Sequence, residues 1–235
     1  MKFSDFTRHF STVRINRYWI ATGKSELKTI KLYKANLEVS QAFHPLLGMV
    51  EVVLRNNLNG ILSLYFNDPN WITNQKNGFM SDLSLTYIQR QTGKRITNDF
   101  LKREIQKIED KLRKSNVPIT SGKIIAEQKF GFWTDLFEIH HYKLLKGKPV
   151  QIFHSLPKSY GRKEIMDELT KIRRFRNRIN HNEPICFVGN CIDFTETIQV
   201  YHSIINILKW IDPQLVKLIA DMDKVQETIN EATKN

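Results

Sequence analysis

A long run of apolar residues at helical spacing constrains this chain more than any other feature of its sequence. Between Leu27 and Phe66, apolar residues recur every three or four positions, which is the period of one face of an α-helix. They are Leu32, Leu37, Val39, Phe43, Leu46, Leu47, Val50, Val53, Leu54, Leu58, Ile61, Leu62 and Tyr65. Pro45 can split or kink this helix, because proline has no backbone donor. The polar segment 67–70 is expected to end it.

The same reading predicts helices along most of the chain. A short helix is expected from Ser81-Asp82 to near Gly93, where Ser81 and Asp82 offer caps. Further helices are expected over 97–114, over 120–145 with an interruption near Gly131, and over 163–181, 195–211 and 213–228. Extended chain is expected only in a small hairpin near 185–194, with Gly189-Asn190 as its turn. With no repeat or Gly/Ser linker, the sequence predicts one all-α domain over residues 1–235.

Composition excludes several classes of protein. The chain has 235 residues, of which 41% are hydrophobic and 11% aromatic, enough to form a buried core. No uninterrupted apolar run approaches the roughly 18 residues of a membrane span, and the N-terminus lacks the apolar region of a secretory signal. Two cysteines cannot build a disulfide framework in a chain of this size. We therefore expect a soluble, cytoplasmic protein with no membrane partner.

The charge of the chain points toward a polyanionic partner. Lys and Arg outnumber Asp and Glu by 36 to 24, which gives a net charge of +12 and an isoelectric point near 9.7. A basic balance of this size is an electrostatic signature of phosphate binding. The alternative is that the surplus charge serves only solubility.

Familiar cofactor and metal signatures are absent from the sequence. It has no Gly-rich phosphate loop, no dinucleotide fingerprint, no His-Glu-x-x-His and no Cys-x-x-Cys. Glu138 and His141 form a Glu-x-x-His without the second copy that a carboxylate-bridged metal pair needs. Cys186 and Cys191 are more typical of ordinary thiols than of zinc ligands. We expect no metal and no cofactor.

The segment 171–184, K-I-R-R-F-R-N-R-I-N-H-N-E-P, concentrates chemistry-bearing side chains. Five basic residues and no acid lie between Lys171 and Arg178. A solvated helix end would explain them, because the helix dipole favours cations at its C-terminus. However, four hydrogen-bonding residues crowd the end of the same stretch: Asn177, Asn180, His181 and Asn182. A histidine imidazole both accepts and donates protons near neutral pH, which suits acid–base catalysis.

Spacing predicts where such a site must lie. Asn177 and His181 are four residues apart and share a helix face, with Arg173 one turn earlier. Arg176 and His181 are five apart, which places them about 140° apart around an ideal helix. They would converge on one phosphate only if the helix loosens at its end, or if two chains face each other. The site is therefore expected at a helix end or a dimer interface.

Three blocks of the sequence resemble a known family. Arg176-Asn177-x-x-x-His181 resembles the Arg-polar-(x)n-His motif of the HEPN superfamily, and the wider R-x-R-N-R-I-N-H-N-E-P is similar to the bacterial Abi-like (abortive infection) family within it. Two more blocks fit that family's pattern in order, E-V-V-L-R-N-N-L from Glu51 and F-G-F-W-T-D-L-F from Phe130. Together the blocks reach from about residue 30 to residue 210.

The resemblance implies a helical bundle that dimerises to face two motifs across a cleft and, in active members, cleaves RNA without a metal. His181 would then be the general acid or base at the ribose 2′-OH, and Arg176 would hold the scissile phosphate. Asn177 would orient either group. The expected product carries a 2′,3′-cyclic phosphate.

Further residues are candidates for binding RNA. Arg173, Arg174, Arg178 and Asn180 surround the motif, and their contacts would weaken steeply with salt. Arg55 would add a phosphate contact if it points to the cleft; the alternative is an ion pair with Glu51, four residues away. The aromatic residues of the block from Phe130 are more typical of core than of a base-stacking platform.

These observations lead to a functional hypothesis with two rivals. The hypothesis is a homodimeric, metal-independent endoribonuclease of phage defence or a toxin-like system, restrained by an antitoxin or activated by a phage-derived trigger. The first rival is a non-catalytic RNA-binding or regulatory module on the same bundle. The second is a protein-interaction domain whose charge serves solubility.

Overall fold

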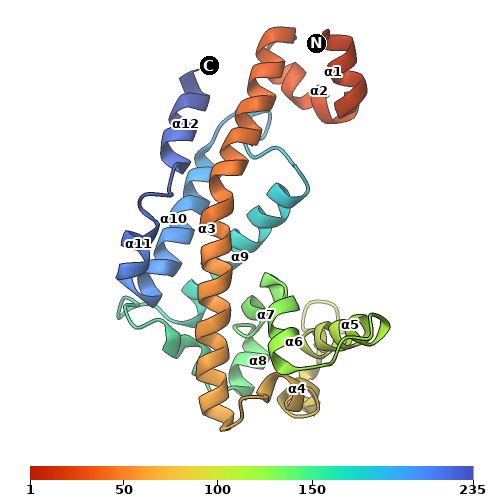
Figure 1. The fold of residues 1–235 in the computed structure, drawn as a ribbon, viewed down its shortest axis with the longest axis vertical. Helices are drawn as coiled ribbons and strands as arrows, with labels where there is room; N and C mark the ends of the chain where they lie inside the picture. Colours follow the sequence, from red (N-terminus) through yellow and green to blue (C-terminus); the bar gives the residue numbers. More distant parts are fainter. Residues whose placement is uncertain (235) are drawn as a thin grey trace. The chain divides into compact units, whose positions relative to one another are not determined.

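The computed structural model describes residues 1–234, and they are mainly helical (Figure 1). Within these described residues, twelve α-helices make the structure 69% helical, and the strands form two small two-stranded sheets. The prediction of an all-α fold is therefore confirmed. The helices are α1 (Phe3–Phe10), α2 (Thr12–Ala21), α3 (Glu26–Phe66), α4 (Trp71–Asn74), α5 (Phe100–Lys114), α6 (Ser121–Glu127), α7 (Phe130–Asp135), α8 (Ile139–Leu144), α9 (Arg162–Asn180), α10 (Thr195–Ile211), α11 (Pro213–Ile219) and α12 (Val225–Lys234).

Helix α3 contains the long apolar run of the sequence and continues through Pro45 without a break. Proline removes one backbone hydrogen bond, but buried side chains lie on both sides of it. These include Val39, Phe43, Leu46 and Val50, all with no exposed surface. Packing of this stripe outweighs the lost hydrogen bond, so Pro45 does not split the helix.

Several helices end in the same backbone turn, with a left-handed residue just beyond the helix. Asn67, Asn116 and Asn182 have φ angles of 49°, 52° and 50° and follow α3, α5 and α9. After α3, Asp68 N–H donates to Ser63 O at 3.0 Å and Asn67 N–H to Leu64 O at 3.2 Å. This pair of bonds is the Schellman motif, in which asparagine tolerates the left-handed conformation. The predicted end at 67–70 is confirmed.

Two of the predicted helices are not found as predicted. Residues 81–93 form 3-10 turns (Phe79–Ser81 and Leu83–Leu85) followed by a hairpin of β1 (Thr86–Ile88) and β2 (Arg95–Thr97). Asp82 caps only the second 3-10 turn, and the β-branched and aromatic residues that follow favour extended chain. Extended chain is thus not confined to 185–194. The helix expected over 213–228 is two helices, α11 and α12.

The region 120–145 is broken more often than its pattern predicted. The first break lies at Gln128-Lys129, before Gly131, and a second separates α7 from α8. A 3-10 turn spans Lys148–Ile152. By contrast, α9 and α10 match their predicted ranges within one residue, and the small hairpin near 185–194 is present as β3 (Phe187–Val188) and β4 (Cys191–Ile192).

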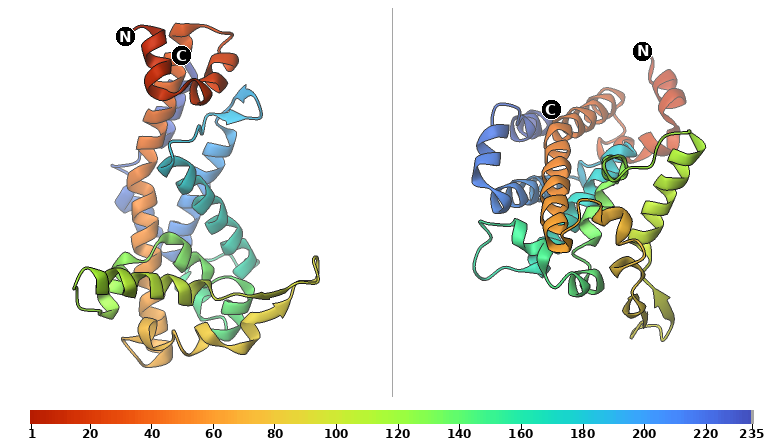
Figure 2. Two further views of the ribbon diagram at one scale, coloured as in Figure 1. Left: turned by 90° about the vertical axis from the view of Figure 1, so that its right-hand side faces the viewer. Right: turned by 60° about the horizontal axis from the view of Figure 1, so that its bottom comes forward.

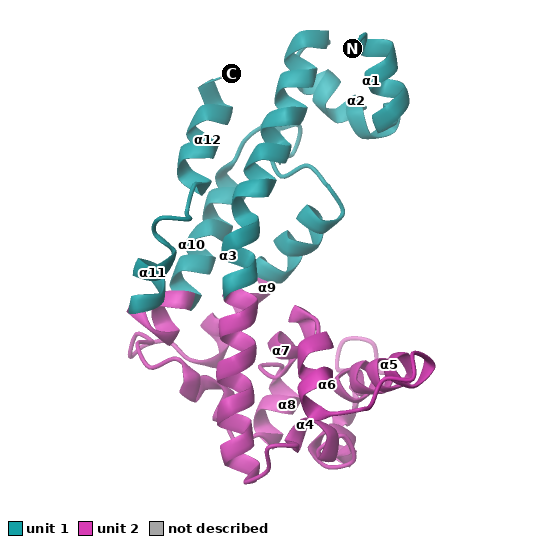
Figure 3. Ribbon diagram, in the orientation of Figure 1, with its two compact units in different colours: residues 1–49, 171–207, 214–235 teal, residues 50–170, 208–213 magenta. Residues whose placement is uncertain are grey.

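The described residues group into two compact units (Figure 3). Unit 1 comprises residues 1–49, 171–207 and the described part of 214–235, and unit 2 comprises 50–170 and 208–213. The single domain predicted over 1–235 stays a prediction. The motif-bearing end of α9 belongs to unit 1.

Aromatic rings fasten the N-terminal helices of unit 1. Tyr33 of α3 contacts Phe6 and Phe10 of α1 and Tyr18 of α2, with ring centroids 5.1–5.5 Å apart. Tyr18 also meets Phe187 of β3 edge-on at 5.2 Å. Such pairs stabilise a fold beyond the apolar area that they bury. The cluster therefore joins α1, α2, α3 and the β3–β4 hairpin.

The core of unit 2 contains the aromatic residues of the block that begins at Phe130. Phe130, Phe132, Trp133 and Phe137 are all buried, which confirms that they serve the core rather than a stacking platform. His141 of α8 is also fully buried, and its Nδ1 lies 3.1 Å from both the backbone oxygen and the carboxylate of Asp135. This buried histidine belongs to the scaffold of the unit.

Among the described residues, α3 alone is long and apolar enough to cross a membrane by length and composition. Part of this helix is buried within the protein, including Val39, Phe43, Leu46 and Val50.

The left-handed turn at Asn67 gives a test of the helix ends. Asn67 is exposed, so Asn67→Val should lower the free energy of unfolding by about 1–2 kcal/mol, because a β-branched residue resists a positive φ. Asn67→Gly should leave stability unchanged or slightly raised. Urea denaturation of both variants checks this, and equal stabilities would contradict the assigned turn.

Candidate functional site at the end of α9

The rotation of α9 is set by three buried residues. Ile172, Phe175 and Ile179 repeat at spacings of three and four and are all at least 97% buried. Phe175 packs on Phe43 of α3, with ring centroids 4.7 Å apart. Because one side of the helix is held in this way, the opposite side must face solvent. The residues exposed there include Arg174, Asn177 and His181.

The helix keeps its geometry through His181. His181 N–H donates to Asn177 O at 3.1 Å, which continues the helical pattern. Asn182 N–H then donates to Ile179 O at 2.9 Å, and Glu183 N–H to Arg178 O at 2.8 Å. These bonds form another Schellman turn, so the helix does not loosen before its end.

This geometry separates the two principal side chains of the motif within one chain. Arg176 lies beside the buried face and is half-buried, whereas His181 is exposed. At 3.6 residues per turn, their directions differ by about 140°. Asn177 lies on the same side as His181. Arg176 and His181 could reach one phosphate if the helix loosened at its end or if two copies of the chain faced each other. The helix does not loosen within the described chain, and the facing of two copies stays a prediction.

Two buried hydrogen bonds hold the chain just after the motif. Ile185 N–H donates to Asn36 Oδ1 of α3 at 2.7 Å. Thr197 Oγ1 of α10 donates to Ile185 O at 2.6 Å. Both side chains are almost fully buried, so each satisfies a backbone group that water cannot reach. Residue 185 is therefore fixed between α3 and α10.

The predicted RNA-binding residues of α9 differ in their surroundings. Arg178 is half-buried and donates to Pro184 O, and its Nη1 lies 3.5 Å from Glu196 Oε2. Arg178 thus fastens the loop that follows the motif. Arg174 and Asn180 are exposed and Arg173 is half-buried, so their predicted RNA contacts stay predictions.

Two arginines that the sequence analysis missed lie beside the motif. Arg14 of α2 donates to the backbone oxygen of Asn182 at 2.8 Å. Arg17 donates to Gly189 O and lies over the ring of Phe187, 4.5 Å from its centroid. Arg14 therefore adds positive charge at the end of α9, where a cation is favoured, and Arg17 adds positive charge at the hairpin that follows. No local pattern signals them, because their partners lie about 170 residues away along the chain.

The two cysteines have opposite environments. Cys186 is buried, and burial raises the pKa of its thiol to about 12, which keeps it protonated and unreactive. Cys191 is exposed. Burial likewise raises the pKa of the neighbouring Tyr18 hydroxyl. Within residues 1–234, no three His, Cys, Asp or Glu side chains are grouped so that they could hold a metal ion.

His181 is exposed, and the motif lies outside the main hollow of unit 1. Unit 1 has a hollow of about 680 Å³ between α2, α3, α10 and α12, lined mainly by aliphatic residues such as Leu32, Ile198 and Ile229. None of the motif residues of α9 lines it. A reaction at His181 would therefore need the ligand or a second copy of the chain to exclude water.

Arg55 belongs to the other unit. It lies on α3 in unit 2 and is half-buried, and its Nε is buried without a hydrogen-bond partner among the described residues. Its contact with RNA stays a prediction.

Comparison with known proteins adds no assignment. No protein-family model, no curated protein and no solved structure matches the chain. The resemblance to the Abi-like family thus stays a prediction based on its three sequence blocks.

The bond from Thr197 to Ile185 gives a test of how the motif is held. Thr197→Val keeps the shape of the side chain but leaves a buried carbonyl unpaired, so the free energy of unfolding should fall by about 1–3 kcal/mol. The matched control is Thr12→Val, an exposed threonine of α2, which should change stability by less than about 0.5 kcal/mol. Urea denaturation measures both. Equal losses would show that the Thr197 bond has no special role.

Proposed function

We propose that this protein is a metal-independent endoribonuclease of the HEPN type, with a site completed by two copies of the chain. The observation that carries the proposal is the end of α9, where Asn177 and His181 face solvent and Arg176 lies half-buried on a neighbouring side of the helix. Arg14, which donates to the backbone oxygen of Asn182, adds a cation beside it. Rigid presentation of an acid–base group beside phosphate-binding cations is what RNA cleavage requires.

The chemistry can be written with these residues alone. A histidine imidazole takes the proton of a ribose 2′-OH while the oxygen attacks the adjacent phosphorus. The O2′–P bond forms and the P–O5′ bond breaks, and the 5′-oxygen leaves as a hydroxyl after taking a proton from the imidazolium of His181. The guanidinium of Arg176 balances the charge that develops on the phosphoryl oxygens. The products are a 2′,3′-cyclic phosphate and a 5′-OH end.

The separation of Arg176 and His181 on one helix supports the dimeric form of the proposal. In an isologous dimer, Arg176 of one copy and His181 of the other can approach the same phosphate. Facing copies would also cover a surface that is open in the single chain, which strengthens electrostatic interactions there.

The proposed biological setting follows the resemblance of the sequence. The enzyme would act in the cytoplasm, in phage defence or as a toxin, under an antitoxin or a phage-derived trigger. The non-catalytic RNA-binding module remains the second candidate, because the exposed arginines would bind phosphate whether or not His181 acts. It predicts RNA affinity that survives loss of His181.

Cleavage of single-stranded RNA in EDTA tests the proposal. Wild-type protein should leave 2′,3′-cyclic phosphate ends, and His181→Ala should be at least about 100-fold slower, as expected for loss of an acid–base group. His202→Ala, an exposed histidine on α10, is the matched control and should cleave like wild type.

Two results would contradict it. Equal cleavage by wild type and His181→Ala would assign the activity to another site or a contaminant. Binding without cleavage by wild-type protein would favour the second candidate.

A further inference from the structure

The β1–β2 hairpin of unit 2 projects from the body of that unit (Figure 2). Its strands pair Thr86 with Thr97, Tyr87 with Ile96 and Ile88 with Arg95. The turn is closed by Gln89 N–H to Lys94 O at 2.8 Å, and Gly93 takes a φ of +66° there. Ile88 is 69% exposed, so the hairpin leaves apolar as well as polar surface open.

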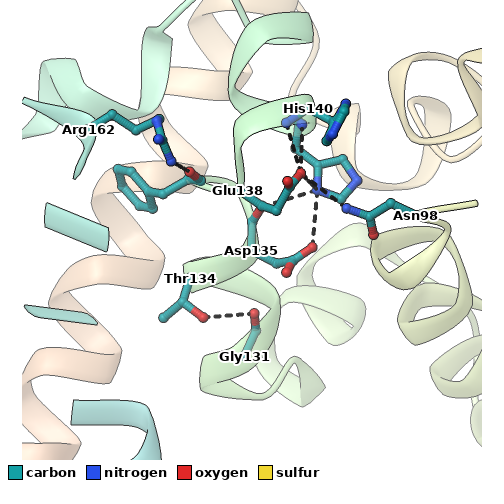
Figure 4. A network of polar contacts seen from close by, with 9 residues as sticks. Asn98, Gly131, Thr134, Asp135, Glu138, His140 and Arg162 are labelled. Atoms are coloured by element: carbon teal, nitrogen blue, oxygen red, sulfur yellow. Dashed lines mark hydrogen bonds and ion pairs between the residues drawn. The ribbon is translucent and has the colours of Figure 1, made fainter. Parts of the chain in front are cut away.

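The foot of the hairpin is anchored by one carboxylate (Figure 4). Glu138 Oε2 accepts from Asn98 Nδ2 at 3.1 Å and from the backbone N–H of His140 at 2.9 Å. The backbone N–H of Asn98 in turn donates to Leu85 O at 2.9 Å, across the base of the hairpin. Glu138 therefore ties the hairpin to the start of α8 and fixes its position within unit 2.

This anchoring places two rings in a flat stack at the surface. The ring of Tyr87 lies on the imidazole of His140, with centroids 4.1 Å apart and planes 11° from parallel. Both residues are half-buried and line an open hollow of about 450 Å³, together with Ile88 and Arg90. Aromatic platforms of this kind hold nucleic-acid bases by stacking, with little preference for sequence.

The hairpin also carries three cations that form no ion pair with any described residue of the chain. Arg90, Lys94 and Arg95 are exposed, and segment 83–98 contains no acidic residue. In the part of the chain that the structure describes, their side chains make no hydrogen bond or ion pair. The neighbouring helix α5 differs, because several of its cations pair with acids three or four residues away, as in Arg103–Asp99 and Lys107–Glu104.

From the stack and the charges together, we infer that the β1–β2 hairpin is a second RNA-contacting surface, specific for single-stranded RNA. Its cations would contact phosphates while the Tyr87–His140 stack receives an unpaired base. Bases of an RNA duplex are stacked internally, and its major groove is too deep and narrow to be read by side chains. The inference rests on the proposed function only in taking RNA as the ligand.

Binding of a short fluorescein-labelled single-stranded RNA tests the inference, with His181→Ala protein so that the probe stays intact. Adding Arg90→Gln, Lys94→Gln and Arg95→Gln should weaken binding at least about tenfold and lower the slope of log affinity against log salt by about 2. The matched control replaces Lys114, Lys123 and Lys129 by Gln, which removes the same charge from exposed positions on and after the far end of α5. It should bind within about twofold of the parent protein.

Variants of Tyr87 distinguish the contribution of base stacking to RNA binding from the contribution of charge. Tyr87→Ala should weaken binding by about fivefold or more without changing the salt slope, and Tyr87→Phe should bind like the parent because the ring remains. The same RNA annealed to its complement should bind more weakly and lose its sensitivity to Tyr87→Ala.

Three results would overturn the inference: absence of RNA binding, equal weakening by both charge triples, or equal affinity for single and double strands. Cleavage results are independent of these. If the hairpin variants lose RNA binding but the wild-type protein never cleaves RNA, the proposed function is refuted and the hairpin inference stands. If the wild-type protein cleaves RNA but the hairpin variants bind RNA normally, the hairpin inference is refuted and the proposed function stands.

Discussion

The packing of Phe175 on Phe43 determines what the candidate site can be. It fixes the rotation of α9, so that Ile172 and Ile179 are buried and Asn177 and His181 face outward. The buried bonds of Asn36 and Thr197 to Ile185 then hold the chain after the motif. The motif is thus presented on a rigid element, as a catalytic constellation requires, rather than on a mobile loop.

The arginines around the motif are of two kinds, those that hydrogen-bond to backbone oxygens and those that are exposed. Arg14, Arg17 and Arg178 donate to backbone oxygens and so stabilise the fold while adding positive charge. Arg174 lies exposed on the outer side of α9. Substitution of the first kind would alter stability together with any RNA affinity, whereas Arg174 reports on affinity with less structural consequence. The same logic makes the exposed cations of the β1–β2 hairpin useful reporters.

Strong periodicity made much of the fold predictable from the sequence. The helix of residues 26–66, the motif helix and α10 each carry a repeated apolar face, and tertiary packing preserved them even across Pro45. The hairpin at 86–97 was missed because Ser81-Asp82 resembles a helix start, whereas the residues after it favour strands. In the site, Arg14 and Arg17 could not be predicted, because they meet their partners through tertiary contacts between distant segments.

Complementation between two inactive variants tests the central claim most directly. If Arg176 of one copy and His181 of the other share a site, mixing Arg176→Ala with His181→Ala protein should regenerate one intact site in each mixed dimer. About a quarter of wild-type RNA cleavage should then return, from equal mixing into symmetric dimers. Replacing either partner with the Arg176→Ala/His181→Ala double variant should give none. No recovery in the first mixture, from variants that fold normally, would contradict the account.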